Sequence, residues 1–128
     1  MIGYITLGTN DLERAGRFYD ELLGEIGASR AMTNERMLGW RSASGETMFS
    51  VIRPFDGEQA SIGNGVMIAL DVKTADRVEA VYRKALALGA TDEGHPHDRG
   101  SSMGFYGGYF RDLDGNKLVA YCLGHVFD

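Results

Sequence analysis

Residues 4–24 encode a β-strand that runs directly into an amphipathic helix. The stretch reads YITLGTNDLERAGRFYDELLG. Ile5 and Leu7 fall on one face of an extended chain and alternate with side chains of the opposite face. This period of two predicts a strand over residues 2–8.

A helix is predicted over about residues 11–26. Asn10 offers an N-cap, and Glu13 three residues later completes a capping box. Apolar side chains then recur at helical spacing, and Gly27 stands where a left-handed C-cap residue is expected. The apolar stripe consists of Leu12, Ala15, Tyr19, Leu22, Leu23 and Ile26.

Three short strands and a polar connection complete the first half. Clusters of turn-forming residues separate the strands. The predicted strands cover residues 28–33, 37–41 and 47–52, and the connection covers about residues 56–64.

The same order of elements then starts again. Thr74 is the expected N-cap of a second helix, whose apolar stripe begins at Ala75 and ends at Gly89. The segment Asp112-Leu113-Asp114-Gly115-Asn116 is a strong hairpin signal. The predicted strands of this half cover residues 66–72, 90–93, 105–111 and 117–123.

The two halves are copies of one module. An offset of 63 residues places Tyr4 on Met67 and Ile5 on Ile68. Two copies are too few for a solenoid. We therefore predict a single α+β domain of two βαβββ modules, with module one at about residues 1–55, a linker at about 56–64 and module two at about 65–128.

Composition excludes several classes of protein. The 128 residues include 13 Lys and Arg against 18 Asp and Glu, a formal charge of −5. This balance argues against binding nucleic acid or an anionic membrane surface. No apolar run reaches the roughly 18 residues of a membrane span, and a cytoplasmic protein is expected. A single cysteine, Cys122, excludes an internal disulfide and an all-cysteine metal site.

Two segments together resemble the vicinal oxygen chelate superfamily, which includes glyoxalase I, bleomycin-resistance proteins and extradiol dioxygenases. One is the first strand and helix, with Asn10-Asp11-Leu12-Glu13 and Arg17-Phe18-Tyr19, and the other is the hairpin with residues 112–118. The resemblance covers essentially the full length. It implies that the two modules form an open, cup-shaped mixed sheet, with helices on the convex face and the active site in the cup.

Strand alternation indicates which side chains line the cup. On each strand, the side chains of one face are apolar, and the helices would cover that face. The side chains of the opposite face mix polar and aromatic groups, which suit a ligand pocket better than a core. The helix-facing set is Ile5, Leu7, Ile68, Leu70, Leu118 and Ala120. The cup-facing set is Tyr4, Thr6, Met67, Ala69, Lys117, Val119 and Tyr121.

The resemblance also locates the metal ligands of members that use a divalent ion. Such members typically place His, Gln or Glu in the first and last strand of each module. Here Tyr4 and Met67 stand at the first-strand positions, Val119 stands at one last-strand position, and residues 48–52 contain no carboxylate, amide or imidazole. A phenol and a thioether do not hold a hard cation. We therefore expect no metal and no other cofactor, which counts against glyoxalase I and dioxygenase activity.

Phe105, Tyr109 and Arg111 share one parity of a predicted strand. We place this parity in the cup because the alternate residues suit the helix side. The three side chains would then form an aromatic wall with a guanidinium that grips an anionic group. The alternative is an ordinary cross-strand cation–π or salt-bridge pair. A bulge at Gly107-Gly108 would invert the facing.

Histidines and tyrosines supply the remaining polar candidates. His95 and His97 flank Pro96 in a predicted loop, where they suit acid–base work or metal binding at the rim, or belong to a solvated turn. His97 is included among the ligand-binding candidates. Tyr4 and Tyr121 would orient a carbonyl substrate, or simply pack as rings.

Several other features carry weaker signals. The glycine-rich residues 100–104 lack both a following Gly-Lys-Ser/Thr and a helix, so they suit a flexible loop better than a phosphate cradle. Cys122 has helix-facing parity and is expected to be buried and inert. Trp40 and Arg41 would extend the aromatic wall if they face the cup, which the pattern leaves open. His125 is expected to be exposed.

Two functions remain open. One is a metal-free binding module, similar to bleomycin-resistance proteins, that holds an aromatic or cationic small molecule. The other is a lactoylglutathione-lyase-like or dioxygenase-like enzyme with a non-standard metal or no metal, using Tyr4, Tyr109, Arg111 and His97. The missing ligands and the acidic balance favour the binding module. The resemblance implies that the chain forms a homodimer. It also implies that the chain binds a small molecule.

Overall fold

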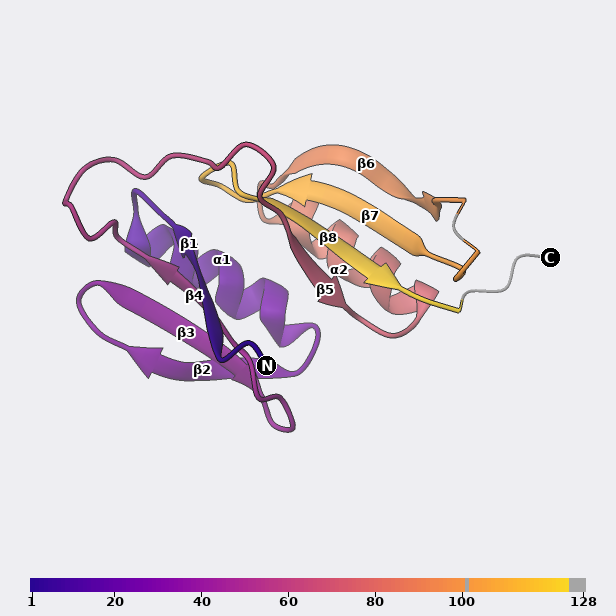
Figure 1. The fold of residues 1–128 in the computed structure, drawn as a ribbon, viewed down its shortest axis with the longest axis horizontal. Helices are drawn as coiled ribbons and strands as arrows, with labels where there is room; N and C mark the ends of the chain where they lie inside the picture. Colours follow the sequence, from indigo (N-terminus) through magenta and orange to yellow (C-terminus); the bar gives the residue numbers. More distant parts are fainter. Residues whose placement is uncertain (101, 125–128) are drawn as a thin grey trace. The chain divides into compact units, whose positions relative to one another are not determined.

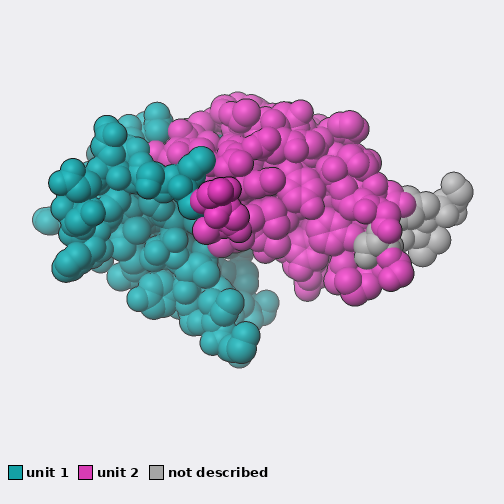
Figure 2. Space-filling view, turned by 45° about the horizontal axis from the view of Figure 1, so that its top comes forward, with its two compact units in different colours: residues 1–63 teal, residues 64–128 magenta. Residues whose placement is uncertain are grey.

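The computed structural model describes residues 1–100 and 102–124 and divides the chain into two compact units, residues 1–63 and 64–128 (Figure 1). Figure 2 shows unit 1 and unit 2 in separate colours. Both units have the order βαβββ, so the predicted α+β fold with a duplicated module is confirmed. Unit 1 contains β1 (Tyr4–Gly8), α1 (Leu12–Gly24), β2 (Ala28–Thr33), β3 (Met37–Ser42) and β4 (Met48–Ile52). Unit 2 contains β5 (Ile68–Asp71), α2 (Ala75–Ala87), β6 (Thr91–Asp98), β7 (Tyr106–Arg111) and β8 (Lys117–Cys122).

Each unit builds one mixed sheet of four strands. The strand orders are β1-β4-β3-β2 and β5-β8-β7-β6. The first and last strands of each unit pair in parallel, and the other neighbours are antiparallel. Helix α1 covers one face of the first sheet, and α2 covers one face of the second (Figure 1). We call the opposite face of each sheet its open face.

The start of α1 differs from the prediction. Asp11, not Asn10, is the N-cap, and its carboxylate accepts a hydrogen bond from the Arg14 amide at 3.0 Å. The Asn10 side chain instead binds the backbone of Ala60, accepting from its N–H at 2.7 Å and donating to its carbonyl at 3.3 Å. The contact with Ala60, 50 residues along the chain, therefore engages Asn10 and leaves Asp11 to cap the helix.

Helix α2 begins and ends as predicted. Thr74 is the N-cap, and its hydroxyl accepts from the Arg77 amide at 3.3 Å. Gly89 follows the helix with a φ of 103°, the left-handed conformation that favours glycine. Gly27 follows α1 in the same way, with a φ of 79°.

Strand β6 is longer than predicted. It extends from Thr91 to Asp98, so His95 and His97 lie in a strand, not in the predicted loop. Its pairing register with β7 shifts on both sides of Gly94, whose φ is 143°. Pro96 is tolerated because β6 is an edge strand, where a missing N–H costs no ladder bond.

The other strands agree with the prediction to within two residues at each end. The largest differences are in the first strand of each unit. β1 begins at Tyr4 where residue 2 was expected, and β5 covers Ile68–Asp71 within the predicted residues 66–72.

Aromatic rings form the core of unit 1. Tyr19 of α1 lies 4.8 Å from Phe49 and 5.8 Å from Trp40, measured between ring centroids. Trp40 is 1% exposed, and its indole N–H donates to Asp20 at 2.8 Å. Trp40 therefore faces α1 and does not extend an aromatic wall on the open face.

Apolar side chains and two phenols fill the helix side of unit 2. Val78, Val81, Phe110 and Leu118 are at most 1% exposed. Tyr82 donates to Asp92 at 2.7 Å, and burial followed by this bond raises the pKa of Tyr82 to about 12.

Tyr106 forms a second phenol–carboxylate pair beneath α2. Its hydroxyl donates to Glu79 at 2.6 Å, and this bond, followed by burial, raises the pKa of Tyr106 to about 12. Tyr106 and Phe110 thus lie on the helix side of β7, as predicted.

The predicted hairpin joins β7 to β8. Asp112 is 6% exposed, and its carboxylate accepts from the amides of Asp114 and Asn116, both at 2.9 Å. It also accepts from the Asn116 side chain at 3.1 Å. Gly115 has a φ of 91°, so glycine is required there. Over the described residues, no helix is long and apolar enough to cross a membrane.

Candidate functional site

The open face of unit 2 gathers most of the predicted site residues. The register of β7 and β8 is continuous, so no bulge at Gly107-Gly108 shifts their pairing. Side chains directly opposite in neighbouring strands point to the same face. One row across the sheet holds Ala69, Val119 and Tyr109; a second holds Tyr121, Gly107 and His97; a third holds Lys117 and Arg111.

Two cations lie over the Tyr109 ring. The Arg99 guanidinium carbon is 4.8 Å from the ring centroid, and the Lys117 ammonium is 5.4 Å from it. Both distances are within the range of cation–π attraction. Tyr109 is only partly buried, so this cluster borders solvent.

Arg111 pairs with a carboxylate on the neighbouring strand. Its Nε donates to Glu93 at 2.5 Å, and its Nη1 donates to the carbonyl of Gly115 at 3.0 Å. The hydrogen bond from Arg111, aided by its charge and by that of Lys117, lowers the pKa of Glu93. Arg111 and Lys117 thus lie near the Glu93 carboxylate, and Asp92 adds a second negative charge there.

An aromatic pair lies on the next row. The rings of Phe105 and Tyr121 stack with centroids 5.1 Å apart and an angle of 4°. Gly107 makes room for this pair, because a Cβ there would lie 2.8 Å from the Phe105 ring. The absence of a side chain at Gly107 therefore leaves a flat aromatic surface beside His97, which pairs with Gly107 across the strands.

The remaining predicted residues are one buried side chain on this face and three residues that lie outside its strands. Val119 shares the open-face row but is 0% exposed. Tyr4 is 60% exposed, and with Thr6 it lies on the open face of unit 1. Met67 is 41% exposed and precedes β5. The part of these four residues in ligand binding stays a prediction.

The positions at which the resemblance places metal ligands do not offer a suitable donor set. Strand pairing identifies the fourth position as Ser50, because Ser50 pairs with Thr6 as Val119 pairs with Ala69. The Ser50 side chain is buried, and its hydroxyl donates to the carbonyl of Ile5. In residues 1–100 and 102–124, no group of three or more His, Cys, Asp and Glu side chains is arranged to hold a metal ion.

Arg99 is a structural residue that the sequence did not single out. Its guanidinium donates to the carbonyls of Gly107, Gly94 and His95 at 3.1, 3.1 and 2.7 Å. These bonds join the bulged part of β6 to β7. In the sequence, the available sign of this role was a cation directly after the strand that contains His95 and His97. A cation at that place does not specify which backbone carbonyls it binds.

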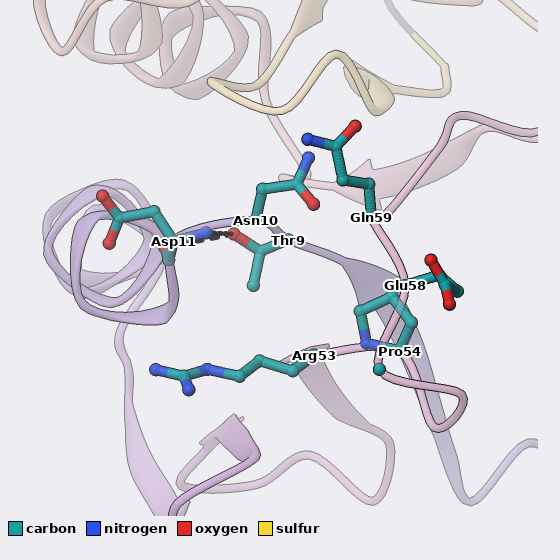
Figure 3. Close-up of a pocket in the computed structure, with 8 residues that line it drawn as sticks. Thr9, Asn10, Asp11, Arg53, Pro54, Glu58 and Gln59 are labelled. Atoms are coloured by element: carbon teal, nitrogen blue, oxygen red, sulfur yellow. Dashed lines mark hydrogen bonds between the residues drawn. The ribbon is translucent and has the colours of Figure 1, made fainter.

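A polar pocket of about 580 Å³ opens in unit 1 where β1 leads into α1 (Figure 3). The Asp11 carboxylate already satisfies the helix start. Together with Glu58, it places two carboxylates against the single guanidinium of Arg53, so the pocket has no net attraction for an anion. The lining residues are Thr9, Asn10, Asp11, Arg53, Pro54, Gly57, Glu58 and Gln59.

Three weaker candidates do not add chemistry to this site. Cys122 is 2% exposed, and burial raises the pKa of its thiol, as expected for an inert side chain. Among residues 100 and 102–104, turns and irregular chain lead into β7, and no helix follows to form a phosphate cradle. Ser101 of this run and His125 lie outside the described residues.

The comparisons with known proteins agree with this architecture. A family model for the glyoxalase-like domain matches residues 4–121. A solved glyoxalase/bleomycin resistance protein from Albidiferax ferrireducens T118 is 32% identical, with 95% of this chain and 98% of that chain covered and a TM-score of 0.86.

Two further solved structures share the fold at lower identity. A glyoxalase/bleomycin resistance protein/dioxygenase family enzyme from Burkholderia phytofirmans PsJN is 17% identical, with 94% and 97% coverage of the two chains and a TM-score of 0.74. A lactoylglutathione lyase from Agrobacterium tumefaciens is 20% identical, with 94% and 92% coverage and a TM-score of 0.69. A search of curated proteins found no match.

Proposed function

Because the chain belongs to the glyoxalase-like domain family, we propose that it binds a small organic ligand on the open face of unit 2 without the divalent metal of metal-using members. The observation that carries this proposal is the identity of the four metal positions. Tyr4, Ser50, Met67 and Val119 provide a phenol, a buried hydroxyl, a thioether and an isopropyl group. Hard divalent ions need several carboxylate, amide or imidazole donors.

The preferred ligand is a flat aromatic anion. The Phe105–Tyr121 pair and the Tyr109 ring supply aromatic surface. Among the described residues, the Lys117 ammonium has no hydrogen bond or ion pair, so its charge is available to a carboxylate. Arg111 lies beside it, since the two residues pair across β7 and β8, and the Arg111 guanidinium is already paired with Glu93.

The test uses 2-naphthoate as the simplest aromatic carboxylate. Calorimetry on chelator-treated protein is expected to show saturable binding, and uncharged 2-naphthamide is expected to bind more weakly. Lys117→Gln is expected to weaken naphthoate binding by about tenfold or more, because a charge-assisted hydrogen bond contributes about 1.5–3 kcal/mol. Tyr109→Ala is expected to weaken it by several fold, because an aromatic pair contributes about 0.5–1.5 kcal/mol. Equal affinity of naphthoate and naphthamide would contradict the anionic part of the proposal.

Bleomycin belongs in the same screen because the resemblance also implies cationic ligands. The proposal expects naphthoate to bind more tightly than this cationic glycopeptide. Binding of bleomycin alone would overturn the assignment of the ligand as an anion, while it would leave a metal-free binding function in place.

The enzyme alternative is tested separately. The proposal expects no turnover above background when chelator-treated protein meets methylglyoxal and glutathione. Turnover that appears after addition of Ni²⁺, Zn²⁺, Fe²⁺ or Mn²⁺ would replace the binding function with a lyase activity. Elemental analysis of the purified protein is expected to show no stoichiometric metal that withstands dialysis.

The proposed assembly is a homodimer. Apolar side chains are exposed near the first strand of each unit, with Ile2 at 54% and Val66 at 55%. A second copy of the chain would remove such surfaces from water. Sedimentation is expected to give about twice 14.0 kDa, and a mass near 14.0 kDa would contradict the dimer.

A further inference from the structure

Two histidines lie side by side on the edge strand of unit 2. His95 and His97 are both exposed, and their ring centroids are 5.1 Å apart. Pro96 between them points to the other face, since its ring lies next to Gly108 and Tyr82 on the α2 side. The packed proline therefore holds the two imidazoles together on the open face.

A backbone hydrogen bond orients one of the imidazoles. His97 Nδ1 lies 3.0 Å from the carbonyl oxygen of His95. A carbonyl accepts and cannot donate, so this bond places the hydrogen on Nδ1. The lone pair of the neutral ring then lies on Nε2, and a backbone carbonyl on the second nitrogen is the usual support of a metal-binding histidine.

The separation of the rings suits a shared ion. When two imidazoles bind one ion as neighbouring ligands through bonds of about 2.0–2.1 Å, their ring centres lie about 4.5 Å apart on a tetragonal ion and about 5 Å apart on a tetrahedral one. The observed centroid distance of 5.1 Å matches the tetrahedral separation. Two residues of opposite phase on the strand, by contrast, would direct their rings to different faces.

The surrounding charges are mixed. The Asp92 carboxylate is held ionised chiefly by hydrogen bonds from Gly94 and Tyr82, which lower its pKa, and His95 and Arg99 contribute smaller attractions. The Arg99 guanidinium donates to the His95 carbonyl at 2.7 Å, and its charge opposes a nearby cation. Two protein ligands beside one cation and one carboxylate make a site of modest affinity, completed by water.

We propose that His95 and His97 together bind one divalent transition-metal ion, in the affinity order expected for imidazole, with Cu²⁺ ahead of Ni²⁺ and Zn²⁺. This site is separate from the four metal positions of the family. It lies on the same open face as the aromatic pair but does not depend on ligand binding there.

The test titrates CuSO₄ and NiCl₂ into protein that carries no affinity tag. Calorimetry is expected to give one ion per chain, and electron paramagnetic resonance of the Cu²⁺ complex is expected to show two equivalent nitrogen ligands. His95→Ala and His97→Ala are each expected to weaken binding about tenfold or more, since even loss of an outer-shell partner costs about 10–100-fold.

His125→Ala is the matched control because it removes the third of the three histidines in the chain. It is expected to bind Cu²⁺ as the wild type does. Urea midpoints are expected to be equal for all three variants, which separates ligand loss from unfolding. Unchanged binding in His95→Ala and His97→Ala, or loss of binding in His125→Ala alone, would overturn the proposal.

Discussion

Both units bury aromatic rings beneath their helix, but unit 2 also stacks a pair of aromatic rings on its open face. In unit 1, Trp40 and Phe49 are buried against Tyr19 of the helix. In unit 2, the Phe105–Tyr121 pair is only partly buried and lies on the open face. A ring beneath the helix stabilises the fold, whereas a ring on the open face is available to a ligand.

The other side chains on the two open faces also differ. In unit 1, the Met48 side chain lies over Gly39, and Ser50 is buried with its hydroxyl bonded to the backbone. In unit 2, Lys117 and Arg111 border the Tyr109 ring. The proposed function therefore assigns ligand recognition to unit 2.

The largest expected difference in stability between the units comes from removing the Trp40 ring. Trp40→Ala is expected to lower the free energy of unfolding by about 3–5 kcal/mol, the range for a large buried aromatic residue. Tyr109→Ala on the open face is expected to cost less than about 1 kcal/mol. Urea denaturation of both variants measures the difference. Equal losses would show that the open-face ring also serves as core.

The turns before the last strands provide the next contrast. Asp112→Ala is expected to cost about 1–3 kcal/mol, because the amides of Asp114 and Asn116 lose their acceptor. Ser42, at the corresponding connection in unit 1, is partly exposed. Ser42→Ala is expected to change stability by no more than about 0.5 kcal/mol. A larger loss for Ser42→Ala than for Asp112→Ala would contradict the contrast.

Alkaline titration sharpens the description of unit 2. The pKa of Tyr82 and that of Tyr106 are each raised to about 12, above the value of about 10 for a free phenol. A raised folded-state pKa means that the neutral phenols stabilise the fold fully below pH about 10. This stability is lost as pH rises towards about 12.

The measurement is the urea midpoint between pH 8 and 12 for the wild type, Tyr82→Phe and Tyr106→Phe. Each variant is expected to lose less stability than the wild type across the upper part of this range, because it lacks one phenol that must ionise. If the urea midpoint fell equally steeply with pH in all three proteins, neither phenol–carboxylate pair would resist ionisation.

Cations at the surface are expected to give the smallest changes in stability. Arg30 in unit 1 forms a two-point bond to Asp20 and lies over the Trp40 ring. Arg30→Gln is expected to cost up to about 1 kcal/mol. Lys117→Gln in unit 2 is expected to stay within about 0.5 kcal/mol, since no ion pair is lost. A destabilised Lys117→Gln would show a structural role for that charge.

Periodicity predicted the elements whose side chains alternate or recur over several residues. The two helices, the hairpin at residues 112–116 and the facing of β7 follow from local pattern, and the structure agrees. The facing of Phe105 and Tyr109 was predictable because Tyr106 and Phe110 suit a core so much better. Local sequence therefore settles a face where large apolar residues take one parity.

Long-range contacts decided what the sequence left open or mispredicted. The backbone of Ala60 engages Asn10, so Asp11 caps the helix. Trp40 could have faced either side, and its bond to Asp20 on α1 fixes the helix side. The length of β6 depends on bulges and on Arg99, whose contacts form only after the strands pair. None of these contacts has a signature within a short window.

The most direct test is the binding of 2-naphthoate to chelator-treated protein, measured by calorimetry with and without Zn²⁺, Ni²⁺ or Mn²⁺ in the His95→Ala variant, which removes one ligand of the proposed histidine site. The account predicts saturable binding that the chelator does not reduce, that added metal does not strengthen, and that falls about tenfold or more in Lys117→Gln. Binding that disappears with the chelator and returns with a divalent ion would contradict a metal-free site on the open face of unit 2.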